Sequence, residues 1–140
     1  MLLVRNVMTE DVKTVSPEMD AFDVAGVMRS HDVGSAPVVD GDGHLVGIVT
    51  DRDLVIRVLG DRSDPKGIRV GDVATRRSIF TISPDAQVSE ARALMAAERI
   101  RRLPVVKGER LVGIVSLGDV ALKKKSSAGD ALKDVSRHTA

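Results

Sequence analysis

A duplicated segment constrains the fold of this chain more than any other feature. Gly47-Ile48-Val49-Thr50-x-x-Asp53 recurs as Gly113-Ile114-Val115-Ser116-x-x-Asp119, each copy preceded by Leu-Val, at a separation of 66 residues. In both copies an apolar β-branched run ends at a hydroxyl followed three residues later by a carboxylate, which is the pattern of a strand that leads into a helix. A repeat of this length predicts two copies of one small fold rather than a solenoid of short repeats.

The duplication covers most of the chain and predicts the same elements in each copy. A β-branched strand (Val12–Val15; Ile79–Ile82) ends at Ser-Pro, and an amphipathic helix follows, with apolar residues spaced three and four apart up to Met28 or Met95. Pro-Val-Val, a glycine-containing turn and Leu-Val-Gly-Ile-Val then predict a hairpin, and a last helix is expected over 51–59 and 117–125. This order of elements is α/β, with a sheet that needs cover on one face.

The repeat also suggests domain boundaries. We expect a first domain over residues 1–62 and a second over 68–125, joined by the polar segment Asp61–Lys66. Residues 126–140 break the pattern and are expected to form a polar tail.

Composition excludes several classes of protein. The net charge of +1 gives no overall field for nucleic acid, and Phe22 and Phe80 are the only aromatic residues, so successive bases have no stacking platform. The 140 residues contain no cysteine and no apolar run near the ~20 residues that span a bilayer. We therefore expect a cytoplasmic protein without a membrane segment.

The repeated strand-to-helix junction, which we call the corner, has two compatible interpretations. Thr50-x-x-Asp53 and Ser116-x-x-Asp119 match the capping box, in which a hydroxyl and an acidic side chain satisfy the first backbone donors of a helix. The same geometry serves a ligand, because helix N-termini attract phosphate and a carboxylate at a strand-to-helix corner can accept hydrogen bonds from a ribose diol.

Taken together, these motifs resemble tandem CBS domains, the arrangement called a Bateman module, over about residues 4–125. The matching features are Thr-Val-Ser-Pro, the helix that ends near Met28 or Met95, Pro-Val-Val and the final Gly-h-h-[Ser/Thr]-x-x-Asp. The length and the Asp-Pro linker also resemble stand-alone two-CBS proteins of the hypoxic response type. The resemblance implies two β-α-β-β-α units paired through their sheets with pseudo-two-fold symmetry, and adenine nucleotides (AMP, ADP, ATP or a related adenosyl compound) as regulatory ligands in clefts between them.

The resemblance also assigns ligand-binding roles to particular residues. The terminal aspartates would hold the ribose hydroxyls, the hydroxyls before them would lie near phosphate or ribose, and the residues around each proline would line the base pocket. The candidates are Thr14, Ser35, Ala36, Pro37, Thr50, Arg52 and Asp53 in the first copy, and Thr81, Arg102, Leu103, Pro104, Ser116 and Asp119 in the second. Arg102 could grip a phosphate, fill the cleft or lie in solvent, so the two sites need not be used equally.

No residues predict catalysis or a resident cofactor. No nucleophile lies beside a base, and His31, His44 and His138 lack metal-ligand spacing and a partner cysteine, so we expect neither an enzyme nor a metal site. The favoured hypothesis is a nucleotide sensor that forms a homodimer through apolar helix faces and signals to an unidentified effector protein. The alternative is an interaction module that needs no ligand and whose two aspartates only cap helices.

Overall fold

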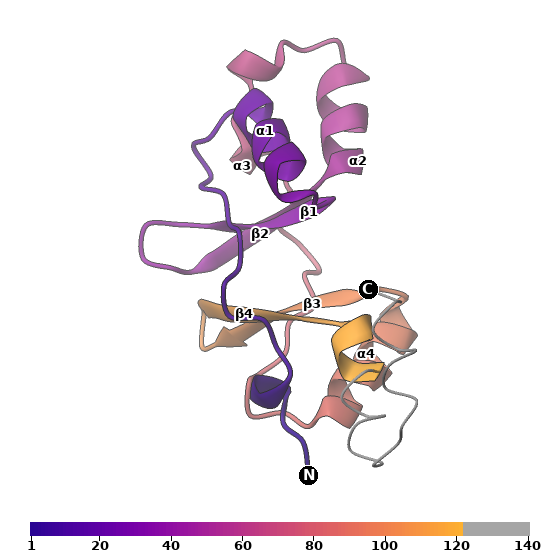
Figure 1. The fold of residues 1–140 in the computed structure, drawn as a ribbon. Coiled ribbons are helices and arrows are strands. Elements are labelled where there is room, and N and C mark those ends of the chain that lie inside the picture. Colours follow the sequence, from indigo (N-terminus) through magenta and orange to yellow (C-terminus); the bar gives the residue numbers. More distant parts are fainter. Residues whose placement is uncertain (122–140) are drawn as a thin grey trace. The chain divides into compact units, whose positions relative to one another are not determined.

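The computed structural model describes residues 1–121 and contains two compact units, each built around one β-hairpin (Figure 1). The first-hairpin unit consists of Lys13–Ile79 with Glu109–Leu111, and the second-hairpin unit of Met1–Val12, Phe80–Gly108 and the chain from Val112 onward. The α/β class is confirmed. The expected tail and residues 122–125 of the last predicted helix lie outside the described residues.

The first-hairpin unit places its helices on one face of a two-stranded antiparallel sheet (Figure 1). Strands β1 (Ser35–Val39) and β2 (Leu45–Thr50) pair with Ser35 opposite Thr50 and an irregularity between Val38 and Val39. The helical elements are α1 (Ala21–His31), α2 (Asp51–Leu54), the π-helical η2 (Val55–Leu59), the 3-10 turn η3 (Pro65–Gly67) and α3 (Val70–Val73). The expected helix over 51–59 is therefore present, with its second half wound more loosely.

The second-hairpin unit repeats this plan. It contains the 3-10 turn η1 (Val4–Asn6), α4 (Val88–Glu98), β3 (Arg102–Lys107) and β4 (Arg110–Ser116), and residues 117–121 are helical. Met28 of α1 and Met95 of α4 are both buried, each in the apolar core of its own unit. The amphipathic helices and the hairpins predicted from periodicity are confirmed. Within residues 1–121, no helix is both long and apolar enough to cross a bilayer.

The two short strands predicted before each Ser-Pro are reduced to single bridges. Val15 pairs in parallel with Val38, and Ile82 pairs in the same way with Val105. The prediction of full strands over Val12–Val15 and Ile79–Ile82 is wrong in extent. Pairing is confined to the last residue of each predicted strand, and the Ser-Pro segment follows directly.

The beginning of each repeat packs on the hairpin of the other repeat. Thr9, from the first repeat, exchanges backbone hydrogen bonds of 2.8 and 2.9 Å with Ile114 of β4. Thr75, its counterpart in the second repeat, exchanges bonds of 2.9 and 2.8 Å with Ile48 of β2. Each unit therefore contains a segment from the beginning of the other repeat, here called the exchanged segment. The domain boundaries suggested by the repeat remain a prediction.

The packing of the exchanged segments on β4 and β2 explains the glycine in the duplicated motif. A Cβ on Gly47 would lie 3.0 Å from the Thr75 carbonyl oxygen, and one on Gly113 would lie 2.9 Å from the Thr9 carbonyl oxygen. Real Cβ atoms rarely approach backbone so closely, so a side chain at either position would push the exchanged segment away.

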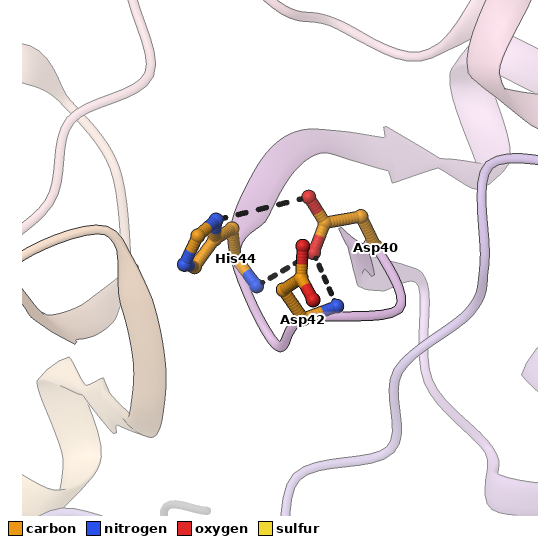
Figure 2. A group of neighbouring side chains, drawn as sticks. All are labelled: Asp40, Asp42 and His44. Carbon is orange, nitrogen blue, oxygen red and sulfur yellow. Dashed lines mark hydrogen bonds and ion pairs between the residues drawn. The ribbon is translucent and has the colours of Figure 1, made fainter.

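The turn between β1 and β2 is held by the side chain of Asp40 (Figure 2). Asp40 Oδ1 accepts hydrogen bonds of 2.9 Å from the backbone N–H groups of both Asp42 and His44. The bond from His44 is the main cause that lowers the pKa of Asp40 below its ordinary value. Gly43 has φ +85°, a conformation that glycine adopts without strain.

Candidate functional site

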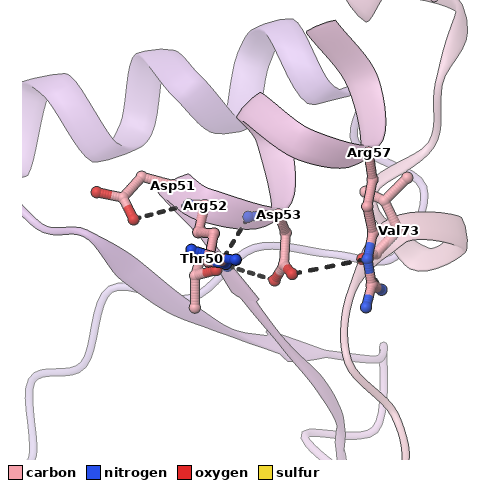
Figure 3. Close-up of polar contacts among 6 residues, drawn as sticks. All are labelled: Thr50, Asp51, Arg52, Asp53, Arg57 and Val73. Carbon is pink, nitrogen blue, oxygen red and sulfur yellow. Dashed lines mark hydrogen bonds and ion pairs between the residues drawn. The ribbon is translucent and has the colours of Figure 1, made fainter. Parts of the chain in front are cut away.

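The first repeated corner forms a capping box at the start of α2 (Figure 3). Thr50 Oγ1 accepts a hydrogen bond of 3.1 Å from the backbone N–H of Asp53, and Asp53 Oδ2 accepts one of 2.9 Å from the backbone N–H of Thr50. Thr50 remains extended, because an N-cap residue keeps the backbone of the preceding strand. The structural interpretation of this motif is therefore confirmed.

The second corner has the same geometry. Ser116 Oγ accepts from the backbone N–H of Asp119 at 3.1 Å, and Asp119 Oδ2 accepts from the backbone N–H of Ser116 at 3.0 Å. Either hydroxyl residue supports the box, since serine and threonine both place an oxygen where the first helical turn needs an acceptor.

Each capping aspartate uses only one of its two carboxylate oxygens in the box. Asp53 Oδ1 lies 3.9 Å from Arg57 Nε, which is too long for a hydrogen bond, and the Asp53 side chain keeps 12% of its surface exposed. Asp119 is also partly exposed, and its Oδ1 accepts no hydrogen bond from residues 1–121. A second acceptor therefore remains at each helix start after the helix has been capped.

Arg57 belongs to the first corner, although the sequence analysis did not single it out. Its Nη1 donates a hydrogen bond of 2.9 Å to the Val73 carbonyl oxygen, and its Nε faces Asp53 (Figure 3). Arg57 thereby links the corner to α3. The sequence contains one indication of this pair, because residues four apart, such as Asp53 and Arg57, lie on the same face of a helix.

The other candidates of the first copy lie around the same end of the hairpin. Val15 donates a backbone hydrogen bond of 3.0 Å to the Pro37 carbonyl oxygen, which brings Thr14 beside β1, and Ser35 is the register partner of Thr50. The side chains of Ala36 and Pro37 are buried. These two residues could therefore present mainly backbone to a ligand.

Arg52 differs from this group because its side chain lies in solvent. It is exposed on the first turn of α2, and its backbone N–H donates to Asp51 Oδ1 at 2.8 Å (Figure 3). Arg52 is near the corner in sequence, but within residues 1–121 its side chain makes no hydrogen bond or ion pair that would hold it there.

The candidates of the second copy gather in the corresponding place of the second-hairpin unit. Ile82 donates a backbone hydrogen bond of 3.1 Å to the Pro104 carbonyl oxygen, so Thr81 lies beside β3. Leu103 and Pro104 are buried, whereas Arg102 is exposed at the start of the strand. The second copy therefore offers a cation where the first offers the small Ser35.

The two corners also differ at the residue pair that joins the strand to the helix. The Asp51 N–H donates to the Gly34 carbonyl oxygen at 2.9 Å, and the Leu117 N–H donates to the Arg101 carbonyl oxygen at 2.8 Å. A Cβ on Gly34 would lie 3.2 Å from Asp51 Oδ2. In the first corner the Asp51 carboxylate takes the space beside Gly34. In the second corner Arg101 stands in place of the glycine, and the apolar Leu117 stands in place of Asp51.

Comparison with known proteins places both repeats in one family. Residues 4–60 and 70–126 each match the family model described as CBS domain. The uncharacterized protein YlbB of Bacillus subtilis is 40% identical over 139 residues, which cover 97% of this chain and 93% of that protein. Hypoxic response protein 1 of Mycobacterium tuberculosis is 36% identical over 121 residues, which cover 86% of this chain and 84% of that protein.

Solved structures of similar proteins contain bound ligands. A structure of CBSX2 in complex with AMP has a TM-score of 0.79 and 27% identity, covering 91% of this chain and 99% of that one. The CBS domain pair of MJ0100, in complex with 5-methylthioadenosine and S-adenosyl-L-methionine, has a TM-score of 0.75 and 25% identity, covering 91% and 98%. Hypoxic Response Protein I, solved with two coordinated zinc ions, has a TM-score of 0.76 and 34% identity, covering 85% and 96%.

Proposed function

The chain belongs to the CBS-domain family and contains a tandem pair of these domains. From this premise we propose that it is a non-catalytic regulatory module that binds an adenine nucleotide or related adenosyl ligand. The observation that carries the proposal is the second carboxylate oxygen of Asp53 and of Asp119, which the capping box does not use. The complexes of CBSX2 with AMP and of MJ0100 with S-adenosyl-L-methionine support the choice of ligand class.

In the proposed complex, the ribose diol donates its hydroxyl hydrogens to Oδ1 of the corner aspartate. A carboxylate is suited to this role because it accepts two hydrogen bonds side by side. Thr50 or Ser116 lies near the phosphate or ribose, and Thr14 or Thr81, with the backbone of residues 35–37 or 102–104, borders the base. Arg52 and Arg102 are the cations that reach an exposed phosphate.

The output of the module is proposed to pass through a homodimer and an effector protein. Support comes from large apolar side chains that remain exposed on α1 and η2: Phe22 (55%), Val55 (55%), Ile56 (55%) and Leu59 (61%). Exposed apolar surface of this kind is typical of a surface that a partner covers. A cytoplasmic location, with no nucleic-acid partner, remains part of the proposal.

A thermal-shift screen tests the ligand class. AMP, ADP, ATP and S-adenosyl-L-methionine are each added at millimolar concentration to the full chain. A one-site ligand at 100 times its Kd adds about 2.7 kcal/mol, so we expect at least one of the four to raise Tm by several degrees. Guanosine monophosphate is the matched control, and an equal shift with it would contradict adenine recognition.

The alternative is an interaction module that needs no ligand. It is favoured by the completeness of the capping boxes, which give both aspartates a structural role, and by the 3.9 Å approach of Arg57 to Asp53 Oδ1. No shift with any adenine compound, together with an intact dimer, would replace the sensor hypothesis with this one.

A further inference from the structure

A cluster of metal-ligand side chains lies on the hairpin turn between β1 and β2, away from the corner residues. Asp40, Asp42 and His44 each offer a ligand atom, and these atoms lie within 4.8 Å of one another (Figure 2). The prediction of no metal site rests on the spacing of the histidines and the lack of a partner cysteine. Two carboxylates, however, stand two and four residues before His44.

The turn holds this cluster in place without using all of its ligand atoms. Asp40 Oδ1 is bound by two backbone N–H groups, and the Gly43 N–H donates to the Asp40 carbonyl oxygen at 3.1 Å. Asp40 Oδ2 is left facing His44 Nδ1 at 3.9 Å. A donor set that is already positioned loses less conformational entropy when an ion binds.

Glu109 places a further carboxylate near His44, from a different part of the sequence. Its Oε2 also lies 3.9 Å from His44 Nδ1. Its backbone is fixed beside the turn, because Leu45 N–H donates to the Glu109 carbonyl oxygen at 3.0 Å and Leu111 N–H donates to the Gly43 carbonyl oxygen at 3.1 Å. His44 Nδ1 therefore lies 3.9 Å from carboxylate oxygens of two residues, Asp40 and Glu109, that are 69 positions apart in the chain.

The spacing of these atoms fits a shared ion better than direct hydrogen bonds. A nitrogen-to-oxygen hydrogen bond spans about 2.7–3.2 Å, whereas two ligand atoms each about 2.1 Å from a tetrahedral Zn²⁺ lie about 3.4 Å apart. The ligand atoms of Asp40, Asp42 and His44 all lie within 4.8 Å of one another, so a small closure brings them to that value. Imidazole with carboxylates suits Zn²⁺ and Co²⁺, while Ca²⁺ and Mg²⁺ prefer oxygen ligands alone.

We propose that Asp40, Asp42 and His44 form a binding site for a divalent transition-metal ion, with the carboxylate of Glu109 near it and water completing the coordination. Arg110 tunes this site, because its Nη1 lies 2.9 Å from the position that a Cβ on Gly43 would take. A cation beside this turn opposes the binding of a second cation.

The test is a Co²⁺ titration of the full chain without nucleotide, followed by visible absorption and by calorimetry with Zn²⁺. We expect a tetrahedral Co²⁺ spectrum that Zn²⁺ displaces. His44→Gln and Asp42→Asn should each weaken binding at least tenfold, and Arg110→Gln should strengthen it. His31→Gln, at an exposed position of α1, is the matched control and should bind as the wild type does.

The proposal is overturned if Co²⁺ gives no saturable signal, or if His44→Gln binds as tightly as the wild type. Because the turn is exposed and its backbone bonds do not involve the imidazole, His44→Gln should fold normally, which circular dichroism verifies. The outcome is independent of the nucleotide proposal, since no nucleotide is present.

Discussion

At the scale of single residues, the corner hydroxyls and carboxylates have a structural role that coexists with the proposed binding role. Asp53 Oδ2 and Asp119 Oδ2 satisfy backbone donors at helix starts, while the other oxygen of each carboxylate is not used by the capping box. A capping box therefore does not argue against ligand binding. It fixes the carboxylate at the helix start where binding would need it.

The N-cap hydroxyl of Thr50 should contribute measurably to stability. Thr50→Ala removes the acceptor for the Asp53 N–H and should lower the free energy of unfolding by about 1 kcal/mol. Thr50→Ser keeps the oxygen, as Ser116 does in the second corner, and should stay close to the wild type. Urea denaturation of the three proteins measures the difference. Equal stability of the alanine and serine variants would contradict this role.

Residue roles were only partly predictable from the sequence. The capping boxes were predictable because they depend on residues three apart. Arg57 was harder to assign, because its hydrogen bond to Val73 joins residues sixteen positions apart. The approach of Glu109 to His44 joins residues 65 positions apart, so no local pattern predicts it.

At the scale of elements, the packing of each repeat beginning on the other hairpin explains why both copies of the duplicated motif contain a glycine. The segments Val4–Thr9 and Val70–Thr75 lie against β4 and β2, and Gly113 and Gly47 leave room for them. The helices and hairpins followed from local periodicity, whereas this exchange depends on contacts that no local pattern contains. The two strands predicted before Ser-Pro form only single bridges, at Val15 and Ile82.

Substitution of these glycines should be destabilising. Gly113→Ala places a Cβ 2.9 Å from the Thr9 carbonyl oxygen and 2.8 Å from Met8 Sδ, so the exchanged segment must move. We expect a loss of about 1–3 kcal/mol, as for other overpacked sites. Gly26→Ala is the control: nothing lies within 4 Å of its Cβ position in α1, and alanine there should stabilise by about 0.5–1 kcal/mol. Calorimetric Tm values that change alike for both variants would contradict the exchange as described.

At the scale of the whole molecule, the duplication gives two related corners whose surroundings differ. Gly34 and Asp51 flank the first corner, and Arg101 and Leu117 flank the second. We therefore expect the two corners to bind with different affinities. The family membership was predictable from the sequence, but the ligand was not, because the surroundings and not the repeated motif set the selectivity.

The proposed homodimer is tested by placing a charge on the exposed apolar helix surface. Ile56→Glu on η2 should shift the chain from dimer to monomer, because burying an unpaired carboxylate in an apolar interface is costly. Light scattering coupled to size-exclusion chromatography measures the mass. Ser89→Glu, an exposed position of α4, is the control and should stay dimeric. A monomeric wild type, or an unchanged mass for Ile56→Glu, would contradict a dimer formed through this surface.

The most direct test of the central claim is calorimetric titration of the adenine ligand found by thermal shift into the wild type, Asp53→Asn, Asp119→Asn and the double variant. Asparagine keeps an oxygen for the capping bond, so Tm without ligand should change little. It removes the carboxylate charge and one acceptor, so at least one single variant should lose tenfold or more in affinity, about 1.4 kcal/mol. The account predicts no measurable binding by the double variant. Undiminished affinity in all three variants would contradict it.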